Sequence, residues 1–282
     1  RGEVRRDMKS AVLAIRIIGD ATSAVAAMDK AKAASMTFKE GLNKASVAAG
    51  ASLAAIGAGA KVCVDAAADL QQSVGGVETV FESSAGKMKQ WSDNAAQAVG
   101  LSKNEYNEFA TLVGSQLQNF GMSVDESADK TNELITLGAD LSSMFGGTTA
   151  DAVDALSAAL KGEMDPIEKY GISLNDATLK AQAASMGLGD LYKSGDRNAK
   201  MQATLAAITA QSGKATGNFA RESDTLQGQQ QRMAAAFENT KATLGEALLP
   251  ILTQVAAKLA EFATWVQQNT SWLVPLVGVI AA

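Results

Sequence analysis

Residues 149–179 read TADAVDALSAALKGEMDPIEKYGISLNDATL, and no other stretch of this chain specifies its local structure so clearly. Leu156 and Leu160 are four residues apart and therefore share one face of a helix. Gly162 follows, and glycine is the residue type that most often ends a helix. The stretch therefore predicts a helix that stops at a glycine, a tight joint and a further helix.

The joint is predicted from two successive helix starts. The first is Asp165–Glu168, which supplies a capping aspartate, a first-turn proline and a glutamate at the third position. The second follows a short extended link over Tyr170 and Gly171, where the Ser173 hydroxyl is expected to cap a helix that Asp176 enters at its third position. The residues that define the joint are Gly162, Asp165, Pro166, Tyr170, Gly171 and Ser173.

Composition favours long helices over strands. The chain has 282 residues, of which 47% are hydrophobic but only 5% aromatic, and alanine supplies much of the apolar share. Its three prolines, at positions 166, 250 and 275, leave long stretches in which a helix can continue. We therefore predict an all-α, extended fold with a long amino-terminal helix, a cluster of helices in the middle and long carboxyl-terminal helices.

The residue inventory excludes several kinds of chemistry. There is no histidine, and Cys63 is the only cysteine, so a His-based triad, a disulfide framework and a Cys/His zinc site are all ruled out. Phosphate-binding, dinucleotide-binding and calcium-binding loop patterns are missing from the sequence. Glu163 and Asp165 could in principle serve a glycosidase, but helix capping already accounts for them. We expect no catalytic residue, no cofactor and no metal.

Charge is distributed unevenly along the chain, whose net charge is −5. Residues 1–44 carry nine Lys and Arg against five Asp and Glu, whereas residues 45–282 carry sixteen against twenty-five. An acidic surface repels nucleic acid, so no specific nucleic-acid binding is expected. The basic amino-terminal stretch is interpreted as a solvated helix face, with contact to an acidic partner surface as the alternative.

The sequence divides into four segments, 1–74, 75–217, 218–271 and 272–282. In the first, apolar or small residues step alternately by three and four, at Met8, Ala11, Ile15, Ile18, Thr22 and Val25. This spacing predicts a coiled-coil seam, and its isoleucines favour a coiled coil of more than two helices. A single helix packed against a flat protein surface would give the same pattern. The uncharged Ala45–Ala60 repeats small residues every fourth position and, at sixteen residues, is shorter than the ~20 of a membrane span, which favours close helix packing.

The middle segment is expected to be a helical cluster. Ser102 with Glu105, and Ser123 with Glu126, have the spacing of capping boxes and follow glycines at 100 and 121. The helix after Ser123 is predicted to bury one stripe, formed by Ala128, Ile135, Leu141 and Phe145.

The carboxyl-terminal helix carries apolar residues on both sides of Pro250, which is expected to kink or interrupt it. Before the proline they are Met233, Phe237, Leu244, Leu248 and Leu249, and after it Ile251, Val255, Leu259, Phe262 and Val266. Trp265 and Trp272 flank the start of an uncharged run over 272–282. They are interpreted either as membrane or partner contacts or as large residues that fill a helix contact. The chain begins without methionine and ends inside this run, so we expect it to be a fragment.

Four blocks of the sequence resemble phage tail tape measure proteins. They are ALKGEMDPIEKYGISL (159–174), VETVFESSA (77–85) with GLS (100–102), FAR, SDTL and QQR (within 219–232), and FENTKA leading to GEALLPIL (within 237–252). Together they lie within residues 75–262. The first seventy residues are similar only in their small-residue, helix-forming composition.

The resemblance implies a structural protein of the virion that sets tail length from the tail lumen or tail tip and leaves before the genome to assist its delivery. It also implies assembly in the host cytoplasm, several copies of itself, and tail tube, distal tail and tail-tip hub proteins as partners. The seam isoleucines favour a trimer. Contact with the host membrane would follow release. Two alternatives stay open at this point: a helical pore-forming or toxin-like protein, and a wall hydrolase.

Overall fold

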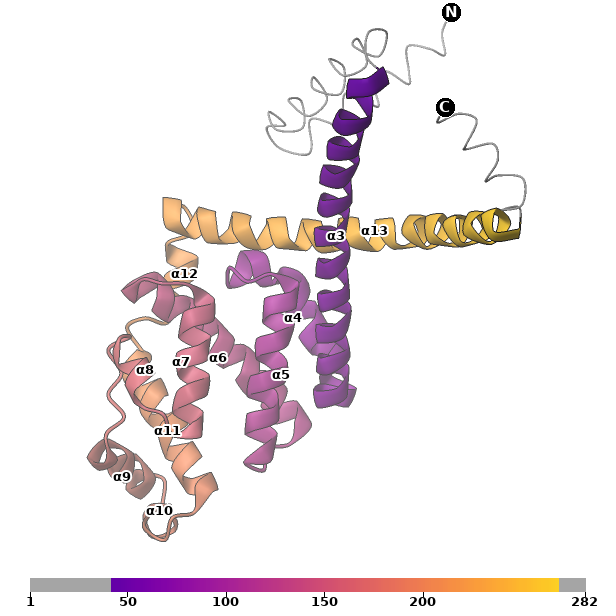
Figure 1. The fold of residues 1–282 in the computed structure, drawn as a ribbon. Coiled ribbons are helices and arrows are strands. Elements are labelled where there is room, and N and C mark those ends of the chain that lie inside the picture. The colour runs from indigo at the N-terminus through magenta and orange to yellow at the C-terminus, as the bar shows by residue number, and fades with distance from the viewer. Residues whose placement is uncertain (1–41, 269–282) are drawn as a thin grey trace, which may run out of the picture. The chain divides into compact units, whose positions relative to one another are not determined.

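The structure is a computed structural model that describes residues 42–268, with side chains from residue 59 onward except at 256, 259, 262, 263, 266 and 267 (Figure 1). The amino-terminal seam over Met8–Val25 and Trp272 lie outside the described residues. Contacts divide the chain into two units, residues 1–60 and 61–282. The described part of the first unit, residues 42–60, is helical and forms the start of α3 (Leu42–Phe81).

The described residues of the second unit form helices joined by short turns, and no strand occurs within 42–268, which confirms the all-α class. After α3 the elements are η2 (Glu82–Ser84), α4 (Ala85–Ala98), α5 (Lys103–Asn119), α6 (Val124–Phe145), α7 (Thr149–Lys161), α8 (Asp165–Glu168), α9 (Asp176–Ser185), α10 (Gly189–Lys193), α11 (Arg197–Ser212), α12 (Asn218–Arg221) and α13 (Leu226–Gln268). An oligomeric coiled coil stays a prediction. The boundary predicted between residues 74 and 75 falls inside α3.

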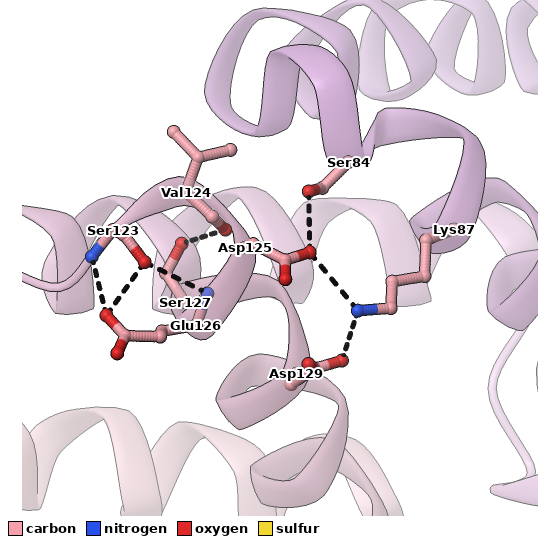
Figure 2. A network of polar contacts seen from close by, with 8 residues as sticks. All are labelled: Ser84, Lys87, Ser123, Val124, Asp125, Glu126, Ser127 and Asp129. Atoms are coloured by element: carbon pink, nitrogen blue, oxygen red, sulfur yellow. Dashed lines mark hydrogen bonds and ion pairs between the residues drawn. The ribbon is translucent and has the colours of Figure 1, made fainter.

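Both predicted capping boxes form. At the start of α6, Ser123 Oγ accepts the Glu126 N–H at 3.3 Å, and Glu126 Oε2 accepts the Ser123 N–H at 3.2 Å (Figure 2). Ser102 and Glu105 make the same reciprocal pair at the start of α5. Each box satisfies donors that the first turn of a helix leaves without intrahelical partners, so these starts are set by local sequence.

A polar network ties the start of α4 to the first turns of α6 (Figure 2). Lys87 Nζ lies 3.3 Å from Asp125 Oδ1 and 2.6 Å from Asp129 Oδ1, and Ser84 Oγ donates to Asp125 Oδ1 at 3.1 Å. The hydrogen bonds from Lys87 and Ser84 hold the pKa of Asp125 below its usual range. The hydrogen bond from Ser123 does the same for the pKa of Glu126.

The core consists of two clusters of buried apolar side chains. The first includes Phe81, Met88, Tyr106, Leu117, Ile135 and Leu160, and the second includes Leu141, Leu156, Ile167, Tyr170, Leu179 and Ile208. Leu156 and Leu160 are both buried, as predicted, and each belongs to a different cluster, so α7 joins the two. Figure 1 shows α5, α6 and α7 packed next to one another.

Glycines let these helices approach closely. A Cβ atom on Gly114 of α5 would lie 2.2 Å from the Phe81 ring, and one on Gly138 of α6 would lie 2.5 Å from Val153 of α7. Real carbon atoms do not come this near without displacement. The fold therefore uses glycine inside these helices despite its poor helix propensity.

The joint after Gly162 has the predicted order but different caps. Gly162 ends α7 with φ of 100°, as predicted. Asp165, however, is the first residue of α8, and its side chain makes no capping hydrogen bond. The predicted Ser173 cap is also wrong, because Asn175 caps α9 and accepts the Thr178 N–H at 2.9 Å. The backbone of Ser173 is instead held by the Gln211 amide, which accepts its N–H at 2.9 Å and donates to its carbonyl at 3.0 Å.

Two further expectations are corrected. α13 continues through Pro250, so the helix is not interrupted there, because the proline removes only one backbone N–H; a kink at Pro250 stays a prediction. Phe145, predicted at the buried end of the α6 stripe, is 46% exposed. Its ring packs edge-on against the Tyr170 ring, with the two ring centroids 6.5 Å apart. Ala128, Ile135 and Leu141 are buried as predicted.

Candidate interaction surface

α13 has one face that packs on the helical cluster and one that does not. On the packed face, Ala235 and Ala242 are buried. A Cβ atom on Gly245 would lie 1.8 Å from the Cys63 carbonyl oxygen of α3, so only glycine allows the two backbones to approach so closely. Small residues thus bring the amino-terminal half of α13 against its neighbours.

Arg232 anchors this half of α13 through backbone carbonyls. Its Nε donates to the Gln97 carbonyl of α4 at 2.9 Å, and its Nη1 donates to the Ser223 carbonyl at 3.0 Å. The guanidinium carbon lies 4.5 Å from the centroid of the Phe219 ring. A planar cation with several donors suits such a position, where helix carbonyls and an aromatic face converge.

Two amide side chains extend the same attachment. Asn239 Oδ1 accepts the backbone N–H of Lys103, the first residue of α5, at 2.8 Å. Gln231 Nε2 donates to the Gly147 carbonyl at 3.0 Å. The amino end of α5 is therefore satisfied partly by its own capping box and partly by α13.

Asp140 of α6 positions the turn that leads into α13. The carboxylate is buried, and it accepts the N–H of Gly217 at 2.7 Å and the N–H of Phe219 at 3.0 Å. Ser143, one turn further along α6, donates to Glu222 Oε2 at 2.7 Å. α12 and the start of α13 are thus fixed by polar side chains of one face of α6.

The opposite face of α13 is apolar and exposed. Its large side chains are Leu226, Met233, Phe237, Leu244, Ile251 and Val255, with exposed fractions from 50% for Val255 to 73% for Leu226. At 3.6 residues per turn these six positions fall within about 20° of one line along the helix, over roughly 44 Å. We call these six residues the α13 stripe.

Charges on α13 are few, and four of its six charged residues form ion pairs within the helix. α13 carries three basic and three acidic residues, so its net charge is zero. Lys241 pairs with Glu238, and Lys258 pairs with Glu261 at 2.7 Å. Monomeric soluble proteins rarely expose large apolar patches, and such patches mark interaction sites.

The site residues predicted from the sequence, the six joint residues and Trp265, are not part of the α13 stripe. The six joint residues lie between the end of α7 and the start of α9, where Tyr170 is buried and Ser173 is exposed. Trp265 lies on α13, is 45% exposed and is not one of the α13 stripe residues. The structure therefore does not bring the joint and Trp265 into one site.

The acids considered for catalysis, Glu163 and Asp165, are both exposed. Over residues 42–268 there is no group of three Asp, Glu or Cys side chains arranged to hold a metal ion. Within the same residues, no helix is both long and apolar enough to cross a membrane.

Sequence reasoning missed the residues that attach α13. Arg232, Asn239 and Asp140 meet partners that are mostly far away in the chain, for example 135 positions from Arg232 to Gln97. No local spacing indicates such pairs. Five of the six α13 stripe residues are among the apolar positions that the sequence places on either side of Pro250, and Leu226 is not.

Comparison with known proteins identifies no relative, since no family model, curated protein or solved structure matches this chain. The resemblance to tape measure proteins therefore rests on the four sequence blocks alone.

Proposed function

We propose that this protein is a structural component of a phage tail, similar to a tape measure protein, and that copies of it associate through the α13 stripe. The observation that carries the association is the line of six exposed apolar side chains on a helix whose other face is already packed. The link to phage tails comes from the four sequence blocks.

The apolar surface is large enough to drive association. Full burial of one Leu, Ile, Phe or Met side chain contributes about 1.5–3 kcal/mol, so the six partly exposed residues together offer on the order of 10 kcal/mol. Association of two proteins costs roughly 4–15 kcal/mol in lost freedom, depending on the reference. The α13 stripe can therefore hold copies together when most of its length is buried.

The charges of α13 are compatible with a second copy as the occupant of the α13 stripe. The net charge of α13 is zero, and its flanking ion pairs are internal to each helix, so like helices meet without repulsion. Parallel copies would place equal apolar residues at equal heights, as in a coiled-coil seam, and three copies agree with the amino-terminal isoleucine pattern.

In a tail, such an assembly would lie along the lumen or at the tip. The length of its helices would then determine the length of the tail tube. The acidic balance of residues 45–282 would not retain the exiting genome. We also propose that the protein leaves the tail ahead of the genome and then contacts the host membrane.

The ruler is tested by a change of helix length in the intact phage protein. Duplication of residues 251–268 adds eighteen residues, which is five turns, so the α13 stripe keeps its phase while the helix gains about 27 Å. Tails measured by electron microscopy should lengthen by about that amount. Tails of unchanged length would contradict the proposal that the protein sets tail length. The control is the Thr253→Asp variant, which keeps the number of residues in α13 and should give tails of native length.

A further inference from the structure

A groove of about 1260 Å³ lies between the ends of α5 and α7, α9 and the first turns of α11. Leu160 and Met201, which line it, belong to the first core cluster, whereas Leu174 and Leu179 belong to the second. The groove is thus the place where the two clusters meet. Its volume exceeds the roughly 300–1,000 Å³ of small-molecule sites, so a peptide segment matches it better than a single small ligand.

Three cations line this groove, Lys161, Arg197 and Lys200, and all three are exposed. Lys161 and Arg197 form no ion pair with any residue in the described part of the chain. The groove is therefore locally basic in a chain whose net charge is −5.

The two acids of the groove are already engaged within the protein. Asp176 is paired with Lys180 and accepts the Tyr192 hydroxyl at 3.2 Å. Asp196 caps α11 by accepting the Ala199 N–H at 2.7 Å. Both carboxylates therefore have partners within the protein, and the groove lining still carries one more cation than acid.

Two of the cations occupy an unfavourable place in their own helix. Arg197 is the first residue of α11 and Lys200 lies in its first turn, where the positive end of the helix dipole disfavours cations. The capping Asp196 offsets part of this effect. A bound anion would relieve the remainder.

We propose that this groove binds an acidic amphipathic helix of a partner protein. Its apolar residues would cover the partly exposed Phe120 and Met164, and carboxylates along one edge would pair with Lys161 and Arg197. An apolar floor beside free cations selects this chemistry over a nucleic acid or another polyanion, which has charge but no apolar face.

The test begins with a random twelve-residue peptide library, displayed on yeast and selected against the full chain. Enriched peptides should be acidic, with apolar residues spaced by three and four. A synthetic copy of the strongest binder should bind the Lys161→Glu, Arg197→Glu double variant at least about tenfold more weakly. The matched control is Lys193→Glu with Lys214→Glu, two exposed lysines outside the groove, which should change affinity less than twofold.

Circular dichroism shows whether each variant remains folded. The proposal is overturned if no peptide is enriched, if the enriched peptides are not acidic, or if both double variants bind alike. It is also overturned if poly-glutamate or heparin binds the groove as tightly as the selected peptide, because charge alone would then account for binding.

Discussion

The buried carboxylate of Asp140 accepts the backbone N–H of Phe219 at 3.0 Å and thereby joins α6 to the turn that leads into α13. The same carboxylate accepts the Gly217 N–H at 2.7 Å. One side chain therefore holds the start of α12, the short helix that precedes the longest described helix.

Replacement of Asp140 should weaken the fold strongly. Asp140→Ala leaves the buried N–H of Phe219 and the partly buried N–H of Gly217 without their acceptor, and we expect the free energy of unfolding to fall by about 2–4 kcal/mol. Urea denaturation measures the change. Asp224→Ala, at an exposed position near the same turn, should lower it by less than about 0.5 kcal/mol. Equal losses in the two variants would show that the Asp140 bonds do not hold this turn.

Close packing predicts opposite effects at two glycines. A Cβ on Gly114 would overlap the Phe81 ring, so Gly114→Ala should destabilise the protein by about 1–3 kcal/mol. Gly86 in α4 has open space around it, and Gly86→Ala should stabilise by about 0.5–1 kcal/mol because alanine favours helix. Thermal unfolding of both variants checks the signs, and stabilisation by Gly114→Ala would refute the close approach.

Acid should destabilise the start of α6. The pKa values of Asp125 and Glu126 are lowered in the folded protein by hydrogen bonds from Lys87 and Ser123. A lowered folded pKa gives stability that is present above the unfolded values of about 4 and is lost as pH falls through the folded pKa. The melting temperature should therefore drop below about pH 4.

Glu126→Gln isolates one part of this effect. The variant should melt lower than the native chain at pH 7, and its melting temperature should change less between pH 7 and pH 3. Glu163→Gln, an exposed acid outside any capping box, is the control. Identical pH profiles for the native chain and Glu126→Gln would mean that the capping box contributes nothing to acid sensitivity.

The sequence could predict what depends on near neighbours. Ser102 and Ser123 were identified as caps because their partners lie three residues ahead, and the all-α class followed from composition and periodicity. The choice between Ser173 and Asn175 as a cap could not be made, because Gln211 holds Ser173 from 38 positions away. The attachment of α13 through Asn239 to Lys103 spans 136 positions, and no spacing rule reaches so far.

Self-association through the α13 stripe is tested most directly by sedimentation equilibrium of the full chain at micromolar concentration. Phe237 and Leu244 lie near the middle of the stripe, and charges there would be buried between copies. We predict an oligomer for the native chain and for the Thr243→Asp, Thr253→Asp control, whose two threonines are exposed and off the stripe. The Phe237→Asp, Leu244→Asp variant should sediment as a folded monomer, and an oligomer of native mass for this variant would contradict the account.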